Sequence, residues 1–360
     1  MYFSLPKEYR EAPTDDLHGR IRAAKESLGD RLVVLAHHYQ RIEVVGYGDY
    51  LGDSYALSRI AAAQKGVEII VFCGVHFMAE SADILTAPDQ RVYLPNPLAG
   101  CPMADMADMA DVMAAWDYLE KFGGADRIMP VSYMNTTAAL KAFTGERGGL
   151  ICTSSNAAKA FRYALDRREK VFFFPDENLG QNTARQMGLA AEEVLVWDFS
   201  RRGGGGFSDE QIDRARAILW KGHCHVHTNF QPEHVRQVRD EHPDARVVVH
   251  PECVPEVVEL ADASGSTKFI VEYCEKAPTG STIAIGTEIN LIHRMARQYP
   301  DKTIFELSGK VCPVCANMYR TTLNDLAYCL ENLEEMKPIR VDEPDRGDAL
   351  KALEKMLQIG

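Results

Sequence analysis

Short apolar runs ending in polar, Gly or Pro residues recur along the chain and alternate with helix-like stretches. Such runs are typical of strands buried on both faces, and their alternation with helices indicates parallel α/β units. The stretches 208–222 and 287–299 carry good helix-starting residues and are predicted to be helices. The strand candidates are RLVVLAHHYQ, EIIVFCGV, RVYLPNP, IMPVSYMNT, LICTSSNA, KVFFFPDEN, VLVWDFS, RVVVHPEC, STIAIGTE and TIFELSGK.

The strand candidates fall into three similar groups. Each group opens with a strand that carries polar residues at positions i and i+2, and residues two apart on an extended segment face the same side. Because ligands gather outside the carboxyl ends of parallel strands, these pairs are candidates for one polar pocket. The pairs are His37 with Tyr39, Tyr133 with Asn135, and His250 with Glu252.

This repetition predicts an α/β protein made of three similar three-layer αβα domains. We expect short parallel sheets in a pseudo-threefold arrangement around a central active site. The expected domains are 25–115, with N- and C-terminal segments packing on it, 116–222 and 223–330, followed by a helical tail over 331–360.

Composition narrows the class of partner. The 360 residues are 46% apolar and 26% charged, and the net charge is −12 with no basic run. This argues against a nucleic-acid or anionic-membrane surface and favours small molecules. The start of the chain lacks the apolar core of a signal peptide and no run suggests a membrane span, so we expect a cytoplasmic protein.

Nine cysteines are too few and too unevenly spaced for a disulfide framework. Four of them lie among apolar or small residues and are expected to be small buried hydrophobes, whereas Cys253 in HPECVP has more polar neighbours. Each strand group closes with a further cysteine. The four buried candidates are Cys73, Cys152, Cys274 and Cys329, and the closing ones are Cys101, Cys224, and Cys312 or Cys315.

Cys312 and Cys315 form a C-x-x-C pair in GKVCPVCANM. This spacing suits a redox dithiol, half of a zinc site or ligands of an iron–sulfur cluster. One cysteine from each repeat would instead give a three-thiolate cluster, whose fourth iron keeps an open position and can act as a Lewis acid.

GHCHVHTNF offers a competing metal site. If this segment is a strand, the alternating His223, His225 and His227 could point one way, as in metal-dependent hydrolases. The alternatives are therefore a zinc-dependent hydrolase that uses HCHVH, a sensor or structural protein with a metal-binding C-x-x-C, or histidines that only line a polar strand end.

Hydroxyl-rich segments point to an anionic substrate. The segments 52–58, 151–156 and 262–267 supply hydroxyls next to expected helix N-termini, which bind carboxylate or phosphate through backbone N–H groups. His250 and Glu252 on one face suit acid–base chemistry.

Eleven motifs, in order between about residue 31 and about residue 325, resemble those of the quinolinate synthase family, whose members build the pyridine ring of NAD in bacteria. They are LAHHYQ, GDSYALS, GCPMADM, VSYMNT, CTSSNA, FFPDENLG, GHCHVH, HPEC, GST, GTE and CPVCANM. The resemblance implies a transferase-type condensation of iminoaspartate with dihydroxyacetone phosphate, which releases phosphate and two waters and gives quinolinate. It also suggests a contact with the enzyme that produces iminoaspartate.

The resemblance further implies a [4Fe–4S] cluster with three cysteine ligands and one iron open to substrate, acting as a Lewis acid in dehydration. The motifs place these ligands at Cys101, Cys224 and Cys315, and leave Cys312 as a non-ligating neighbour.

The resemblance also implies roles for individual residues, each assigned through the motif in which it lies. Tyr39 is implied as a proton donor or acceptor and Glu252 as the main base, with His37 and His250 as further catalytic residues. The implied substrate-binding residues are His37, Ser54, Tyr133, Asn135, Ser154, His250, Glu252 and Thr267.

Overall fold

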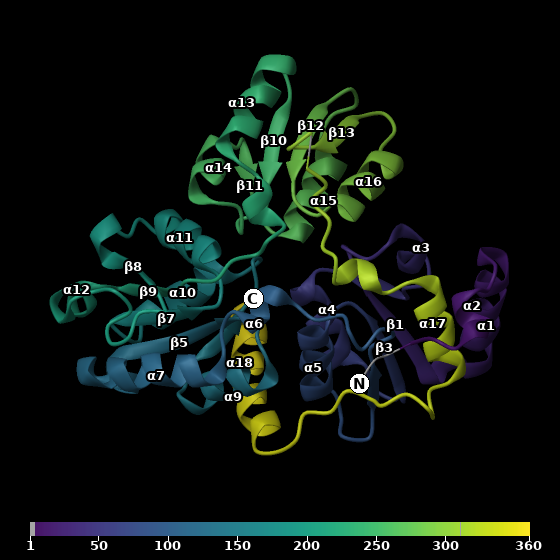
Figure 1. The fold of residues 1–360 in the computed structure, drawn as a ribbon, viewed down its shortest axis with the longest axis horizontal. Coiled ribbons are helices and arrows are strands. Elements are labelled where there is room, and N and C mark those ends of the chain that lie inside the picture. The colour runs from purple at the N-terminus through teal and green to yellow at the C-terminus, as the bar shows by residue number, and fades with distance from the viewer. Residues whose placement is uncertain (1–3, 310) are drawn as a thin grey trace. The chain divides into compact units, whose positions relative to one another are not determined.

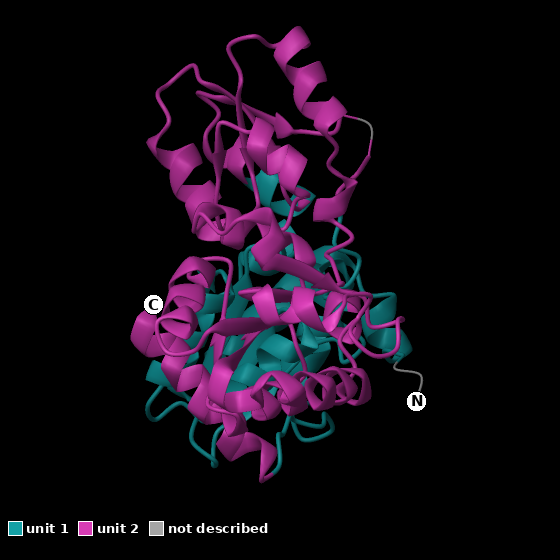
Figure 2. Cartoon of the chain, turned by 90° about the vertical axis from the view of Figure 1, so that its left-hand side faces the viewer, with its two compact units in different colours: residues 1–101, 289–294, 314–342 teal, residues 102–288, 295–313, 343–360 magenta. Residues whose placement is uncertain are grey.

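The computed structural model describes residues 4–309 and 311–360 and shows an α/β fold with three short sheets whose strand pairs are all parallel (Figure 1). The chain divides into two compact units (Figure 2). Unit 1 comprises 1–101, 289–294 and 314–342, and unit 2 comprises 102–288, 295–313 and 343–360. Within the described residues, no helix has both the length and the apolar character needed to cross a bilayer.

Unit 1 contains the first sheet, in the order β2-β1-β3-β4. Its core joins Val34 and Val71 of the sheet to Ile21 and Leu326 of two covering helices. The strands are β1 (Leu32–His37), β2 (Tyr50–Gly52), β3 (Ile69–Cys73) and β4 (Arg91–Tyr93). The helices are α1 (Lys7–Arg10), α2 (Thr14–Leu28), η1 (Gly29–Arg31), α3 (Ile42–Val45), α4 (Ser54–Ala63), α5 (His76–Leu85), η5 (Met318–Arg320) and α17 (Leu323–Glu331), and α16 (Ile289–Gln298) begins here.

Unit 2 contains the second sheet, in the order β6-β5-β7-β9-β8. Its strands are β5 (Ile128–Tyr133), β6 (Leu150–Cys152), β7 (Lys170–Phe174), β8 (Val194–Trp197) and β9 (Ala217–Trp220). The accompanying helices are α6 (Pro102–Asp105), α7 (Met109–Leu119), η2 (Glu120–Phe122), α8 (Gly124–Arg127), α9 (Ala138–Glu146), α10 (Ala157–Leu165), α11 (Glu177–Gln186), η3 (Ala191–Glu193) and α12 (Asp209–Arg214).

The third sheet also belongs to unit 2 and has the order β11-β10-β12-β13. Its strands are β10 (Arg246–Val249), β11 (Ala263–Ser264), β12 (Thr282–Gly286) and β13 (Thr303–Glu306). Its helices are η4 (His227–Asn229), α13 (Pro232–Glu241), α14 (Pro255–Leu260) and α15 (Thr267–Lys276). The C-terminal helix α18 (Asp345–Ile359) packs on α9 of the second sheet.

The expectation of short parallel sheets flanked by helices is confirmed, whereas the limits of the three repeats stay a prediction. One predicted element is wrong in part: the stretch 208–222 is not a single helix. Ser208 caps α12, which ends at Arg214, and the following apolar residues form β9. These residues leave the helix because β9 pairs with both β7 and β8 and is fully buried between them.

Candidate functional site

A buried carboxylate lies at the centre of a polar cluster in unit 2. Glu252 follows β10 and is 3% exposed. Its Oε1 accepts a hydrogen bond from the hydroxyl of Tyr133, the last residue of β5, at 2.5 Å. Its Oε2 lies 2.7 Å from Nδ1 of His227. Residues from two sheets therefore converge on one carboxyl group.

Two stacked imidazoles flank this carboxylate. The rings of His227 and His250 lie 4.4 Å apart and 19° from parallel. His227 Nε2 lies 3.1 Å from the hydroxyl of Thr287, so both of its ring nitrogens have partners. The backbone N–H of Glu252 donates to His250 Nδ1 at 3.3 Å, and His250 Nε2 therefore carries the proton toward Ser154 Oγ at 3.2 Å.

The electrostatics of the cluster favour an ionised Glu252. Burial by itself would raise the pKa of this carboxyl, but the neighbouring His250 and His227 and the Tyr133 hydrogen bond lower the pKa to about 2. Burial and the Glu252 charge raise the pKa of the Tyr133 phenol well above its usual value. They also raise the pKa of Asp176, which caps α11, so one carboxyl of the region is charged and the other is held toward its neutral form.

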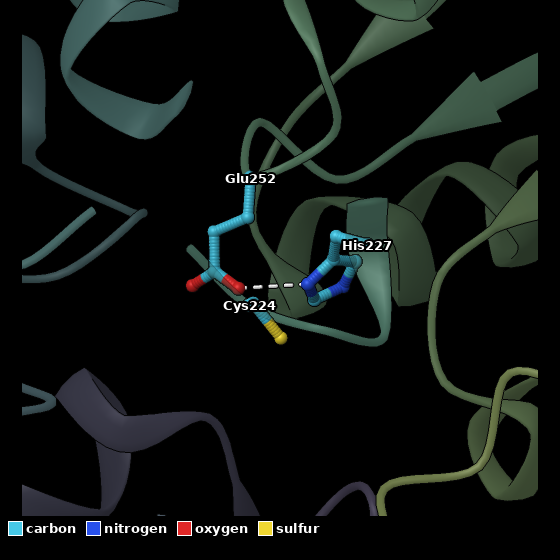
Figure 3. A group of neighbouring side chains, drawn as sticks. All are labelled: Cys224, His227 and Glu252. Atoms are coloured by element: carbon cyan, nitrogen blue, oxygen red, sulfur yellow. Dashed lines mark ion pairs between the residues drawn. The ribbon is translucent and has the colours of Figure 1, made fainter. Parts of the chain in front are cut away.

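Cys224 joins this cluster. Ligand atoms of Cys224, His227 and Glu252 all lie within 4.8 Å of one another, which is close enough for a shared metal ion. Figure 3 shows the Cys224 side chain next to the ion pair between Glu252 and His227. A thiol, an imidazole and a carboxylate form a donor set that suits iron or zinc.

A second group of predicted site residues lies in unit 1, after β1. The backbone N–H of Tyr39 donates to His37 Nδ1 at 3.2 Å, and the two rings meet edge to face at 4.8 Å. Arg294 donates to Nδ1 of the adjacent His38 at 2.7 Å, and burial together with this cation lowers the pKa of His38 to about 2. Ser54 is the first residue of α4, which Asp53 caps by accepting from the N–H of Ala56.

Comparison with known proteins identifies the family. The sequence model of the family described as quinolinate synthetase A protein matches residues 19–358. A quinolinate synthase of Corynebacterium glutamicum is 49% identical over 358 residues, covering 99% of this chain and 90% of that protein. Those of Acidobacterium capsulatum and Streptomyces coelicolor are each 50% identical, covering 98% and 97% of this chain and 95% and 90% of the relatives.

The chain belongs to the quinolinate synthetase A family. It is therefore an enzyme of the quinolinate synthase type, acting in NAD biosynthesis on small substrates, and family membership implies an iron–sulfur cofactor. The resemblance seen in the sequence is confirmed.

The cysteines of this family member fall into classes that fit such a cofactor. Cys101, Cys224 and Cys315 are each partly exposed, and Cys312 is exposed. The other five thiols are buried, and burial raises their pKa values, to about 12 for Cys73 and about 11 for Cys274, which disfavours the thiolate needed by a metal. The buried cysteines are Cys73, Cys152, Cys253, Cys274 and Cys329, so the expectation for the four apolar sites is confirmed.

The competing prediction for GHCHVHTNF is wrong in its geometry. Residues 222–226 form a loop and turn, and His227 begins η4, because the chain reverses after β9 instead of continuing as a strand. His227 is buried against Glu252, whereas His223 and His225 are partly exposed. Burial and the neighbouring His227 and His223 lower the pKa of His225.

The structure brings together some of the predicted site residues and adds others. Tyr133, Ser154, His250 and Glu252 form one connected hydrogen-bonded group. Asn135 is partly exposed after β5, and Thr267 is buried at the first turn of α15. The added partners are His227, Thr287 and Asp176. The motif FFPDENLG contained Asp176, but only the fold shows that its charge interacts with that of Glu252.

Proposed function

We propose that the enzyme condenses iminoaspartate with dihydroxyacetone phosphate to give quinolinate, releasing phosphate and two waters. Family membership supports this reaction. The observation that carries the proposal is the buried, ionised Glu252 held between Tyr133 and His227, beside Cys224. A condensation that loses two waters needs groups that accept and return protons, and such groups gather there.

We assign a [4Fe–4S] cluster to Cys101, Cys224 and Cys315. Their partial exposure suits thiolate ligands better than the five buried thiols do. When bound, a cluster with three thiolates supplies an open iron that acts as a Lewis acid toward a departing hydroxyl. Cys312 is exposed and is assigned as a neighbour that does not ligate.

Protons are handled by the chain's own side chains. Glu252 is ionised at neutral pH and is therefore always in the form that accepts a proton, which we assign as the role of main base. Because the pKa of Glu252 is low, this carboxylate readily gives up a proton that it has accepted, while His227 Nδ1 at 2.7 Å stabilises its negative charge. Tyr39, with His37 beside it, is assigned as a second proton donor or acceptor.

Substrate carboxylate and phosphate groups need donors at the strand ends. His250 Nε2 and the hydroxyl of Ser154 supply such donors in unit 2. Tyr133, whose hydroxyl donates to Glu252, is assigned as a substrate-binding residue beside them. Ser54 and Thr267 each stand at the first turn of a helix, where the helix dipole favours an anion. Asn135 completes the proposed substrate-binding set, together with His37, His250 and Glu252. The cytoplasmic location and the contact with the iminoaspartate-producing enzyme stay predictions.

The test is anaerobic purification of the full chain, with iron and sulfide analysis and a quinolinate assay. We expect a brown protein that forms quinolinate from the two substrates. Cys101→Ala and Cys224→Ala should each lose cluster iron. A colourless, zinc-loaded protein with full activity would contradict the proposal.

A zinc-dependent hydrolase is the second candidate, favoured by the closeness of Cys224, His227 and Glu252. Three protein ligands with one open position are typical of catalytic zinc. Under this alternative, His227→Ala would abolish zinc binding and hydrolysis, whereas Cys101→Ala would leave both unchanged.

A further inference from the structure

A cavity of about 490 Å³ lies in unit 2 beside the Glu252 cluster. Residues from the starts of α10 and α15 line it, together with residues of α11 and α14. Ser154 lines the cavity and is also the hydrogen-bond partner of His250, so the cavity and the cluster share one wall. Pro251, between His250 and Glu252, also lines it.

Two buried asparagines among the residues that line this cavity each have one side-chain atom without a hydrogen-bond partner. Asn156 and Asn182 are 4% and 8% exposed. Within residues 4–309 and 311–360, Nδ2 of Asn156 and Oδ1 of Asn182 have no hydrogen-bond partner. A buried polar atom without a partner costs about 1–3 kcal/mol, so such atoms point to a bound group.

The orientation of both amides is fixed by the bonds that they do make. Oδ1 of Asn156 accepts from the N–H of Thr153 at 2.8 Å, which leaves Nδ2 as a donor without a partner. Nδ2 of Asn182 donates to the carbonyls of Pro251 and Cys253 at 2.8 and 2.9 Å, which leaves Oδ1 as an acceptor. A group that pairs with both atoms must therefore accept one hydrogen bond and donate another.

The charge around the cavity favours an anion. Asn156 is the N-cap residue of α10, yet its side chain makes no capping bond, so the helix presents its N-terminal dipole without a side-chain cap in the described structure. Lys159 lines the cavity, is exposed and forms no ion pair with another described residue. Among the described lining residues, none is acidic.

We propose that this cavity binds a phosphate group, and we call Ser154, Asn156, Lys159 and Asn182 the phosphate vestibule. A phosphate accepts from Nδ2 of Asn156 and from Lys159, and its protonated oxygen, or a hydroxyl of the phosphate ester, donates to Oδ1 of Asn182. The assignment rests on the proposed function for its source, which is either the phosphorylated substrate or the inorganic phosphate that it releases. Ser154 links the vestibule to His250 and so to the Glu252 cluster.

The test is calorimetric binding to the anaerobic holoenzyme, with inorganic phosphate in one arm and dihydroxyacetone phosphate in the other. Asn156→Asp is isosteric, keeps the acceptor for Thr153 and suits an N-cap position, but it replaces the donor by a negative charge. We expect affinity to fall about tenfold or more in Asn156→Asp and in Lys159→Ala. Lys268→Ala, which removes a nearby exposed lysine outside the vestibule, should bind like the wild type.

The proposal is supported if both variants lose binding of inorganic phosphate or of dihydroxyacetone phosphate. The probe whose binding is lost then identifies the source of the phosphate group. The proposal is overturned if Lys159→Ala and Asn156→Asp bind both probes with unchanged affinity, or if the wild type binds neither probe. If the dihydroxyacetone phosphate arm responds, the KM for this substrate should also rise in both variants. Unchanged affinities for both probes, together with an unchanged KM and normal quinolinate formation, would refute the vestibule alone. Variant-sensitive phosphate binding without quinolinate formation would instead refute the proposed function alone.

Discussion

Glu252→Gln removes one buried negative charge while keeping the size of the side chain. The amide retains an oxygen that can accept from Tyr133, but it no longer attracts His227 at 2.7 Å. Because Glu252 is 3% exposed, solvent screens this attraction little. The substitution therefore isolates the charge of the carboxylate from its packing.

The lowered pKa gives the size of the effect on stability. The folded-state pKa of Glu252 is about 2, against an ordinary 4.5. The gap between these two pKa values corresponds to about 3–4 kcal/mol of folding free energy at pH 7. We expect Glu252→Gln to lower the free energy of unfolding at pH 7 by about that amount.

The pH dependence has a definite sign. A carboxyl whose pKa is depressed on folding contributes its full stability above the unfolded pKa and loses it as the pH falls toward the folded pKa. The difference between wild type and Glu252→Gln should be constant from pH 7 to about pH 5.5, about 1 kcal/mol smaller by pH 4, and absent near pH 2. Urea unfolding of both proteins under anaerobic conditions, at a series of pH values from 7 to 2, measures this difference in stability.

Glu259→Gln is the matched control, because Glu259 is an exposed residue of α14 paired with Arg185 at the surface. Its removal should cost less than about 1 kcal/mol. Glu252→Gln should keep its cluster iron and lose quinolinate formation. The reasoning would be refuted if wild type and Glu252→Gln were equally stable at pH 7, or if their difference in stability grew on acidification. Retained turnover of Glu252→Gln would also refute it.

Three further outcomes follow from the same structure. Cys315→Ala should lose cluster iron and Cys312→Ala should largely keep it, and iron analysis showing the reverse would exchange the two assignments. Tyr133→Phe removes a buried hydrogen bond to a carboxylate, so unfolding should show a loss of about 1.5–3 kcal/mol. Gly145→Ala would place a Cβ 1.8 Å from a backbone oxygen of α18 and should destabilise by at least about 1–3 kcal/mol. Gly19→Ala, in an open helical position, should stabilise by up to about 1 kcal/mol, and matching effects at the two glycines would contradict this account of packing.

The sheets were predictable because each long strand is a continuous apolar run, but β9 was not. Its residues follow an amphipathic stretch, and their helix-like pattern continues across the junction after Arg214. They form a strand because they pair with β7 on one side and with β8 on the other, and this pairing exists only in the assembled sheet. The same limit hid the role of His227, a candidate metal ligand in the sequence, because its contact with Glu252 depends on a loop after β9 that reaches this carboxylate.

The polar pairs at the strand ends were predicted for a reason that the structure changes. Residues two apart on an extended segment share a face, which is the reason for pairing His37 with Tyr39 and His250 with Glu252. In the structure, however, His37 ends β1 and His250 directly follows β10, and the second residue of each pair lies in a turn. In each turn the backbone N–H of the second residue donates to Nδ1 of the histidine, at 3.2 and 3.3 Å. This bond leaves Nε2 as the ring donor in both repeats. What the two repeats share is therefore an oriented imidazole, and the second residue of each pair, a phenol in one and a carboxylate in the other, is free to differ in its chemistry.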